Sequence, residues 1–127
     1  MSEGQQNFKT LVIGASTNES RFSYLAIKSL VKNNVEVVAI GKRTGVVEGI
    51  KIETEPKHFD NIHTVSLYLN PSNQEPYIHY IIGLKPKRII FNPGTENPKL
   101  VELARTNNIE YIFGCTLVML STKNYFE

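Results

Sequence analysis

The stretch Lys9–Ser23 reads KTLVIGASTNESRFS, and the rest of the chain is organised around it. Residues 10–13 are β-prone and largely apolar, which is typical of a strand buried on both faces by helices. The run ends at Gly14, where a residue without a Cβ allows a sharp turn and a close approach by a ligand. Small residues follow, and Arg21 stands where a helix is predicted to begin. The stretch therefore predicts a strand that turns through glycine into a helix.

This turn predicts a phosphate site. The first N–H groups of a helix have no partner within the helix, and the helix dipole is positive at that end. Both features favour phosphate, and Arg21 adds a guanidinium that binds phosphate through two hydrogen bonds. The alternative is a tight strand-to-helix turn without a ligand. An NAD site is disfavoured, because the fingerprint GxGxxG needs three glycines and Ser16 stands at the second glycine position.

Length and composition limit the kind of protein. The chain has 127 residues, which predicts one domain over residues 1–127 with a polar tail over residues 1–8. A hydrophobic share of 41%, without an apolar run of about 18–20 residues, predicts a soluble protein that does not enter a membrane. The polar start MSEGQQN and the single Cys115 favour the cytoplasm. A net charge of +2, with no basic run interleaved with aromatic residues, argues against a nucleic-acid partner.

Predicted strands and helices alternate along the chain. Apolar residues at helical spacing predict helices over residues 22–33 and 98–107, one from Pro71 to near Gly83, and a short covering helix after Gly114. Further main strands are predicted over residues 35–40, 63–69, 87–91 and 109–113, with a short strand near 50–52 in an irregular segment over 45–58. Five main strands alternating with helices predict an α/β fold, a doubly wound, Rossmann-like parallel sheet with helices on both faces.

In such a sheet, a ligand lies across the carboxyl ends of the strands, at the point where the strand order reverses. This rule places four turns along one edge of the sheet. They are Gly14–Arg21, Gly41–Arg43, Leu69–Pro71 and Asn92–Gly94. We therefore expect the ligand site at this edge.

With these turns in view, the chain resembles the small standalone proteins of the CoA-binding domain family. The domain of that family is similar to the N-terminal domain of the succinyl-CoA synthetase α subunit. The resemblance covers about Lys9 to Met119. Its match points are the sequence VIGAS over residues 12–16, Arg21 and Ser23 downstream, Gly49, Cys115, and Asn92-Pro93-Gly94, where the family commonly has glutamine, a variable residue and glycine.

The resemblance implies that the small-molecule nucleotide ligand is coenzyme A or an acyl-CoA. The family pattern implies that the Gly14–Ser16 turn and Arg21 hold the pyrophosphate of CoA, while the end of the second strand faces the ADP moiety. The candidate ligand-binding residues are therefore Gly14, Ala15, Ser16, Asn18, Arg21, Ser23, Lys42, Arg43, Leu69, Asn92, Pro93 and Gly94.

The second strand ends differently from the family pattern. The family usually has an asparagine-proline pair there, and this chain has Gly41-Lys42-Arg43. Two cations at this position would pair with the 3′-phosphate that distinguishes CoA from NAD. No Asp or Glu closes the strand to accept the ribose hydroxyls, as an NAD site requires. The alternative is that Lys42 and Arg43 are solvated loop charges.

Other chemistry-bearing residues fit structural roles. The neighbours of Cys115 carry no charge to activate a thiol, so a small core cysteine is expected. The histidines His58, His63 and His79 lack the spacing of a metal site. Tyr24 stands at the helix start, where its ring would either stack on adenine or fill the core.

Residue count also limits the chemistry. In a CoA ligase, catalysis needs a phosphorylated histidine domain and an ATP-grasp partner, and 127 residues leave no room for them. We therefore expect a binding module without catalytic activity of its own. Two alternatives remain, an NAD(P)-binding oxidoreductase-like protein and a Rossmann-fold interaction module that has lost its ligand. A partner protein or a homodimer is compatible with the open edges of such a sheet.

Overall fold

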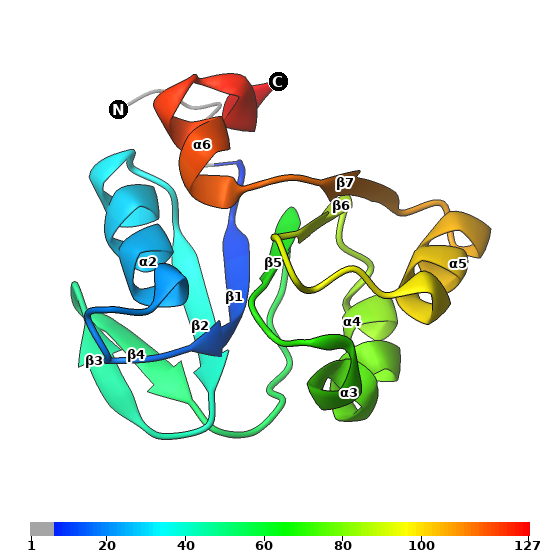
Figure 1. Ribbon diagram of the computed structural model, residues 1–127, viewed down its shortest axis with the longest axis horizontal. Coiled ribbons are helices and arrows are strands. Elements are labelled where there is room, and N and C mark those ends of the chain that lie inside the picture. Colours follow the sequence, from blue (N-terminus) through cyan, green and yellow to red (C-terminus); the bar gives the residue numbers. More distant parts are fainter. Residues whose placement is uncertain (1–6) are drawn as a thin grey trace.

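A seven-stranded sheet lies between two layers of helices (Figure 1). The computed structural model describes residues 7–127. The strands are β1 (Thr10–Ala15), β2 (Val37–Gly41), β3 (Gly45–Val47), β4 (Ile50–Glu53), β5 (Thr64–Leu67), β6 (Arg88–Phe91) and β7 (Glu110–Phe113). The helices are α2 (Phe22–Lys32), α3 (Pro71–Gln74), η1 (Glu75–Tyr77), α4 (Ile78–Leu84), α5 (Pro98–Thr106), α6 (Thr116–Ser121) and η2 (Asn124–Phe126). Most of the polar tail expected over residues 1–8 lies outside the described residues, and Phe8 of that tail packs its ring against His63.

The strand order is β3-β4-β2-β1-β5-β6-β7, and every neighbouring pair except β3 with β4 is parallel. Without β3, this is the order of the dinucleotide-binding fold, in which the chain first builds outward from β1 on one side and then on the other. The order reverses between β1 and β5. The expected doubly wound, Rossmann-like parallel sheet is therefore confirmed.

The expected strand count of five was wrong. The irregular segment over residues 45–58 contains a hairpin, in which β3 pairs antiparallel with β4 and β4 pairs parallel with β2. Its two-residue turn is formed by Glu48 and Gly49, with φ of 50° and 78°. Two successive positive φ values are characteristic of a tight type I′ hairpin turn. The short strand expected near residues 50–52 is β4, whereas β3 and the turn were missed because Glu rarely adopts a positive φ.

The core has two layers, one on each face of the sheet. On β1, Leu11 and Ile13 belong to the layer that contains residues of α4 and α5, whereas Val12 and Ala15 belong to the layer that contains residues of α2, α6 and η2. Successive strand residues point to opposite faces. Both faces are covered by helices, so β1 and β2 are largely apolar runs, whereas β5 also buries the polar residues Thr64 and Ser66.

The helices differ from expectation in one place. The helix expected from Pro71 to Gly83 is divided into α3, η1 and α4, and Pro76 lies at the division. Proline has no N–H and its ring clashes with the preceding turn, so it interrupts a helix. The helix over 98–107 is confirmed as α5, with Asn97 at its N-cap accepting a hydrogen bond from the Lys99 N–H.

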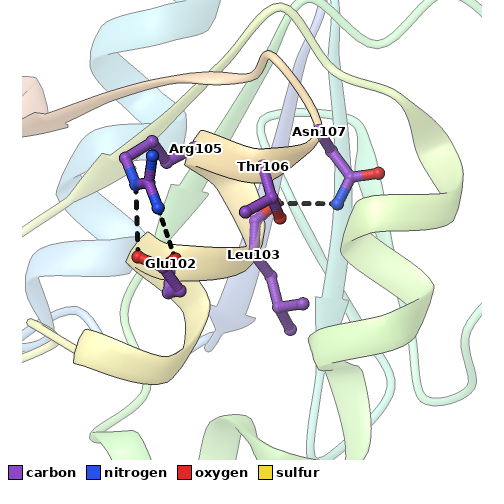
Figure 2. Close-up of polar contacts among 5 residues, drawn as sticks. All are labelled: Glu102, Leu103, Arg105, Thr106 and Asn107. Carbon is purple, nitrogen blue, oxygen red and sulfur yellow. Dashed lines mark hydrogen bonds and ion pairs between the residues drawn. The ribbon is translucent and has the colours of Figure 1, made fainter.

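The last turn of α5 is closed by its own side chains (Figure 2). The amide Nδ2 of Asn107 donates to the Leu103 carbonyl at 2.8 Å, and the Thr106 hydroxyl donates to the same oxygen at 3.2 Å. Arg105 pairs with Glu102 one turn earlier. The short covering helix expected in the tail is α6, which contacts α2. None of the helices in residues 7–127 has the length and apolar character needed to cross a bilayer.

Candidate ligand-binding site at the carboxyl edge of the sheet

Gly14 lies at an irregularity near the end of β1. Ile13 is in register with Ile40 and Ala15 with Gly41, so Gly14 is an extra residue on β1. Its φ is +96°, and a Cβ at this position would lie 3.0 Å from the Tyr68 carbonyl carbon. Glycine is needed here because of its backbone conformation and because the chain passes close to the residue after β5. The turn therefore has a structural reason that does not depend on a ligand.

The residues between β1 and α2 form a chain of short-range hydrogen bonds. The Ser16 hydroxyl accepts from the Asn18 N–H at 3.0 Å, and Asn18 Oδ1 accepts from the N–H and the hydroxyl of Ser20. The Arg21 N–H donates to the Asn18 carbonyl at 3.0 Å. Such side-chain turns fix a loop without help from a sheet. They hold the backbone in place where α2 begins.

The N-terminus of α2 has no side-chain cap. Arg21 occupies the N-cap position in an extended conformation, its side chain makes no capping hydrogen bond, and the first turn contains no acidic residue. The early N–H groups of α2 are therefore available to an anion. Arg21 is exposed beside them, whereas Ser23 is buried in the first turn.

Lys42 and Arg43 lie close to this turn. A Cβ on Gly41 would be 2.2 Å from the Ala15 carbonyl oxygen, and a Cβ on Gly45 would be 2.4 Å from Thr17 Cγ2. The loop after β2 therefore packs directly against the loop after β1. The structure brings the predicted cations to the same edge as the glycine turn.

Charge at this edge is unbalanced. None of the ion pairs within residues 7–127 includes Arg21, Lys42 or Arg43, and all three residues are exposed. The carboxylate of this loop is Glu19, which is exposed and unpaired over the same range. Three cations beside an uncapped helix N-terminus create a positive potential that attracts a polyanion.

Leu69 lies just after β5 and is half-buried. Its carbonyl accepts a hydrogen bond of 2.8 Å from the amide of Gln74, which is fully buried. Gln74 also donates to the Thr95 carbonyl and accepts from the amide of Asn97. The loop after β5 is thus joined to the loop after β6 by one side chain. Sequence reasoning missed Gln74, because the contact joins loops that are distant in the sequence.

Asn92 ends β6 and is buried, with an exposed fraction of 2%. Its Nδ2 donates to the Ser66 hydroxyl at 3.0 Å and to the Leu67 carbonyl at 2.8 Å. Its Oδ1 accepts from the Thr116 N–H at 2.9 Å. Every polar group of this amide is therefore used inside the protein. The role predicted for Asn92 as a ligand residue stays a prediction, and its observed contacts join β5, β6 and α6.

Pro93 and Gly94 are exposed beside Asn92. Gly94 has φ of +91°, and a Cβ at this position would meet no atom within 4 Å. Its N–H donates to Glu96 Oε1 at 3.0 Å. This turn therefore offers an open surface at the predicted edge, on the far side of β5 from the Gly14 turn.

Tyr68 is a second residue that sequence reasoning overlooked at this edge. Its backbone contacts Gly14, and its ring packs on the same core layer as Ala15. The hydroxyl is buried beside Ser66 and Thr116 and makes no hydrogen bond within residues 7–127. Burial raises the pKa of this phenol to about 12, so it stays protonated. The alternating pattern HTVSLYL was the available signal, because it places Tyr68 at the end of a strand.

Cys115 follows β7 at this edge of the sheet. Cys115 is half-buried at the N-cap of α6, so it is more exposed than the core position expected for it. Over residues 7–127, no group of three or more His, Cys, Asp or Glu side chains is arranged to hold a metal ion.

A cavity of about 520 Å³ lies elsewhere, at the opposite edge of the sheet. Its walls include His63, Lys87 and Glu110, which stand just before or at the starts of β5, β6 and β7. None of its lining residues belongs to the four predicted turns. The carboxyl-edge site is thus a separate surface.

The fold is that of a Rossmann-like α/β protein. At the carboxyl edge of its sheet, where the strand order reverses, lie the Gly14 turn and the cations Arg21, Lys42 and Arg43. The chain belongs to the CoA-binding domain family, whose model matches residues 9–121. The resemblance seen in the VIGAS turn and the Asn92-Pro93-Gly94 turn is thereby confirmed at the level of the family. None of the curated proteins matches the chain.

Several solved structures are similar to this protein. An uncharacterized protein shares 46% identity with a TM-score of 0.88, covering 91% of this chain and 95% of that one. A hypothetical protein from Pyrococcus horikoshii OT3 shares 20% identity with a TM-score of 0.82, covering 91% and 82%. The dinucleotide-forming acetyl-coenzyme A synthetase 1 of Ca. Korarchaeum cryptofilum, described in complex with phosphate and ADP, shares 15% identity with a TM-score of 0.70, covering 87% and 26%. The last two likenesses support the fold alone.

Proposed function

We propose that this protein binds coenzyme A or an acyl-CoA at the carboxyl edge of the sheet. One observation carries the proposal: Arg21, Lys42 and Arg43 have no ion pair within the described chain, Arg21 stands at the uncapped N-terminus of α2, and Lys42 and Arg43 follow β2 on the loop that packs against the Gly14 turn. CoA carries a pyrophosphate and a 3′-phosphate, so it offers negative charge to more than one cation. Membership of the CoA-binding domain family supports this ligand class.

The two phosphate groups are assigned to different residues. The pyrophosphate would bind the N–H groups at the start of α2, the Gly14–Ser16 turn and the guanidinium of Arg21. The 3′-phosphate would pair with Lys42 and Arg43, which follow β2. The loops at Leu69 and at Pro93-Gly94 border the same edge and would line the rest of the ligand.

The proposed activity is binding without catalysis, in the cytoplasm. A nicotinamide dinucleotide is the second candidate, since the strand order is that of the dinucleotide-binding fold. Against it stand the single glycine of the turn and the cations after β2, where an acidic residue would bind the ribose hydroxyls. An interaction module without a ligand is the third candidate.

Mass spectrometry of the native protein, purified without added nucleotide and then incubated with equimolar CoA and NAD, separates the three candidates. We expect a mass increase equal to CoA or an acyl-CoA, reduced in Arg21→Ala. The matched control is Arg105→Ala, which removes an exposed arginine on α5 and should retain the ligand. Retention of NAD alone, or of no nucleotide, would contradict the proposal.

A further inference from the structure

The cavity of about 520 Å³ at the amino edge of the sheet contains an unusual buried charge. Arg88 lines this cavity, and its exposed fraction is 3%. Its Nε donates to the Thr64 hydroxyl and its Nη2 to the Tyr125 carbonyl, both at 2.8 Å. The guanidinium also lies over the Tyr125 ring, 4.4 Å from the centroid, and 5.5 Å from the centroid of Phe8. These neutral partners fix the orientation of the side chain.

The charge of Arg88 has no carboxylate partner in the part of the chain that the structure describes. A buried ion is costly unless an opposite charge accompanies it. Aromatic faces and carbonyl oxygens offset part of that cost. The third guanidinium nitrogen, Nη1, makes no hydrogen bond within residues 7–127 and is left for an additional acceptor.

Further donors surround the same cavity. Lys85 and Lys87 line it, and both are exposed and without an ion pair over residues 7–127. His63 also lines it, with Nδ1 engaged by the Thr64 hydroxyl at 2.7 Å. The pKa of His63 is lowered to about 4, first by burial and further by the positive charges of Arg88 and Lys87.

Two carboxylate side chains, Glu110 and Glu127, also line the cavity. No ion pair joins either Glu to Lys85, Lys87 or Arg88. The amide of Asn107, another lining residue, is turned back onto the Leu103 carbonyl (Figure 2). The contacts to a bound anion would therefore come from Arg88, Lys87 and His63.

From this arrangement we propose a second ligand site, in which Arg88, Lys87 and His63 bind a small oxyanion, either a phosphate or a carboxylate group. The site lies at the amino ends of β5, β6 and β7, and the turns assigned to CoA lie at the carboxyl ends. The two sites therefore occupy separate surfaces. A guanidinium that is already oriented by Thr64 and Tyr125 loses little freedom when it binds an anion.

The test is an NMR titration of ¹⁵N-labelled protein in the presence of saturating CoA, with inorganic phosphate in one arm and succinate in the other. Ionic strength is held constant with sodium chloride. We expect saturable shifts of the amides of residues 85–88 and 107–110 with at least one anion, and the arm that shifts them identifies the group. Shifts confined to residues 14–21, or equal shifts with sodium chloride alone, would overturn the proposal.

Variants extend the test. Lys87→Ala removes an exposed charge and should weaken binding by roughly two- to fivefold. Its control is Lys51→Ala, which removes the same charge from β4, away from the cavity, and should leave the titration unchanged. Arg88→Lys keeps a buried cation but removes the planar guanidinium. We expect the anion titration of this variant not to saturate. Equal affinities in wild type, Lys87→Ala and Arg88→Lys would contradict the site.

Discussion

Gly14 lies directly against the backbone of Tyr68, so that a Cβ added to Gly14 would come 3.0 Å from the Tyr68 carbonyl carbon and 3.1 Å from its Cβ. The contact lies where the strand order reverses, between the ends of β1 and β5. The glycine that begins the proposed pyrophosphate turn is therefore also required by the sheet. A substitution of Gly14 would therefore affect both ligand binding and folding stability. A matched control variant is needed to tell the two effects apart.

Gly94 provides that control, because its φ of +91° is close to the +96° of Gly14 while the space around it is open. An Ala at either position adopts an unfavourable left-handed conformation, which costs about 1–2 kcal/mol. Gly14→Ala should lose a further amount of about 1–3 kcal/mol from overpacking against Tyr68. Urea unfolding without ligand measures both variants. Equal losses would show that the Tyr68 contact does not restrict the turn.

Asn92 should be a structural residue. Asn92→Asp keeps the shape and the acceptor for the Thr116 N–H, but removes the donors to Ser66 and Leu67. We expect a loss of about 2–4 kcal/mol in unfolding free energy at pH 7, because two buried hydrogen bonds donated by the Asn92 amide are lost. Asn70→Asp is the control, since the Asn70 side chain acts as an acceptor at the N-cap of α3 and should tolerate the change. Unfolding of Asn92→Asp at the wild-type midpoint would refute this role.

The sequence allowed the strand, glycine turn and helix over Lys9–Ser23 to be predicted, because their signals are local. Apolar periodicity, a glycine and an N-terminal helix boundary all lie within a short window. The same reasoning placed the four turns at one edge, since parallel strands that alternate with helices must end together. Loop packing of Gly41 against Ala15 confirms this placement for the first two turns.

The remaining features depend on contacts between distant residues. The hydrogen bond from the Thr116 N–H to the Asn92 side chain joins residues that are 24 positions apart in the chain. Gln74 joins two loops through Thr95 in the same way. The hairpin turn at Glu48 was missed because its positive φ is imposed by the pairing of β3 with β4. No local pattern contains this information.

His63 makes stability depend on pH. Its pKa is lowered from 6.5 to about 4 in the folded protein, so between these values the unfolded state binds more protons. The unfolding free energy should therefore fall as the pH decreases from about 6.5 towards 4. His63→Gln should show a weaker fall over that range, whereas His79→Gln, an exposed control, should follow wild type. Identical pH profiles for His63→Gln and wild type would contradict the shift.

Lys42 and Arg43 should decide the preference for the 3′-phosphate. We expect CoA to bind more tightly than 3′-dephospho-CoA by about 0.5–1.5 kcal/mol at low salt, with a smaller difference as salt is raised, because the contact is exposed. The Lys42→Ala, Arg43→Ala double variant should remove most of that preference. Calorimetry with both ligands measures it. Equal affinities of wild type for the two ligands at low salt would make these residues solvated loop charges.

The central claim is that the carboxyl edge binds CoA, and the most direct measurement is a thermal-shift titration of the wild-type protein with CoA and, in parallel, with NADH. A ligand that binds only the folded state raises the melting temperature, and above its Kd the rise grows with the logarithm of the ligand concentration. We predict a concentration-dependent rise with CoA that exceeds the rise with NADH at every equal concentration. A larger rise with NADH would contradict the account in favour of a dinucleotide site, and no rise with either ligand would contradict it in favour of a module without a ligand.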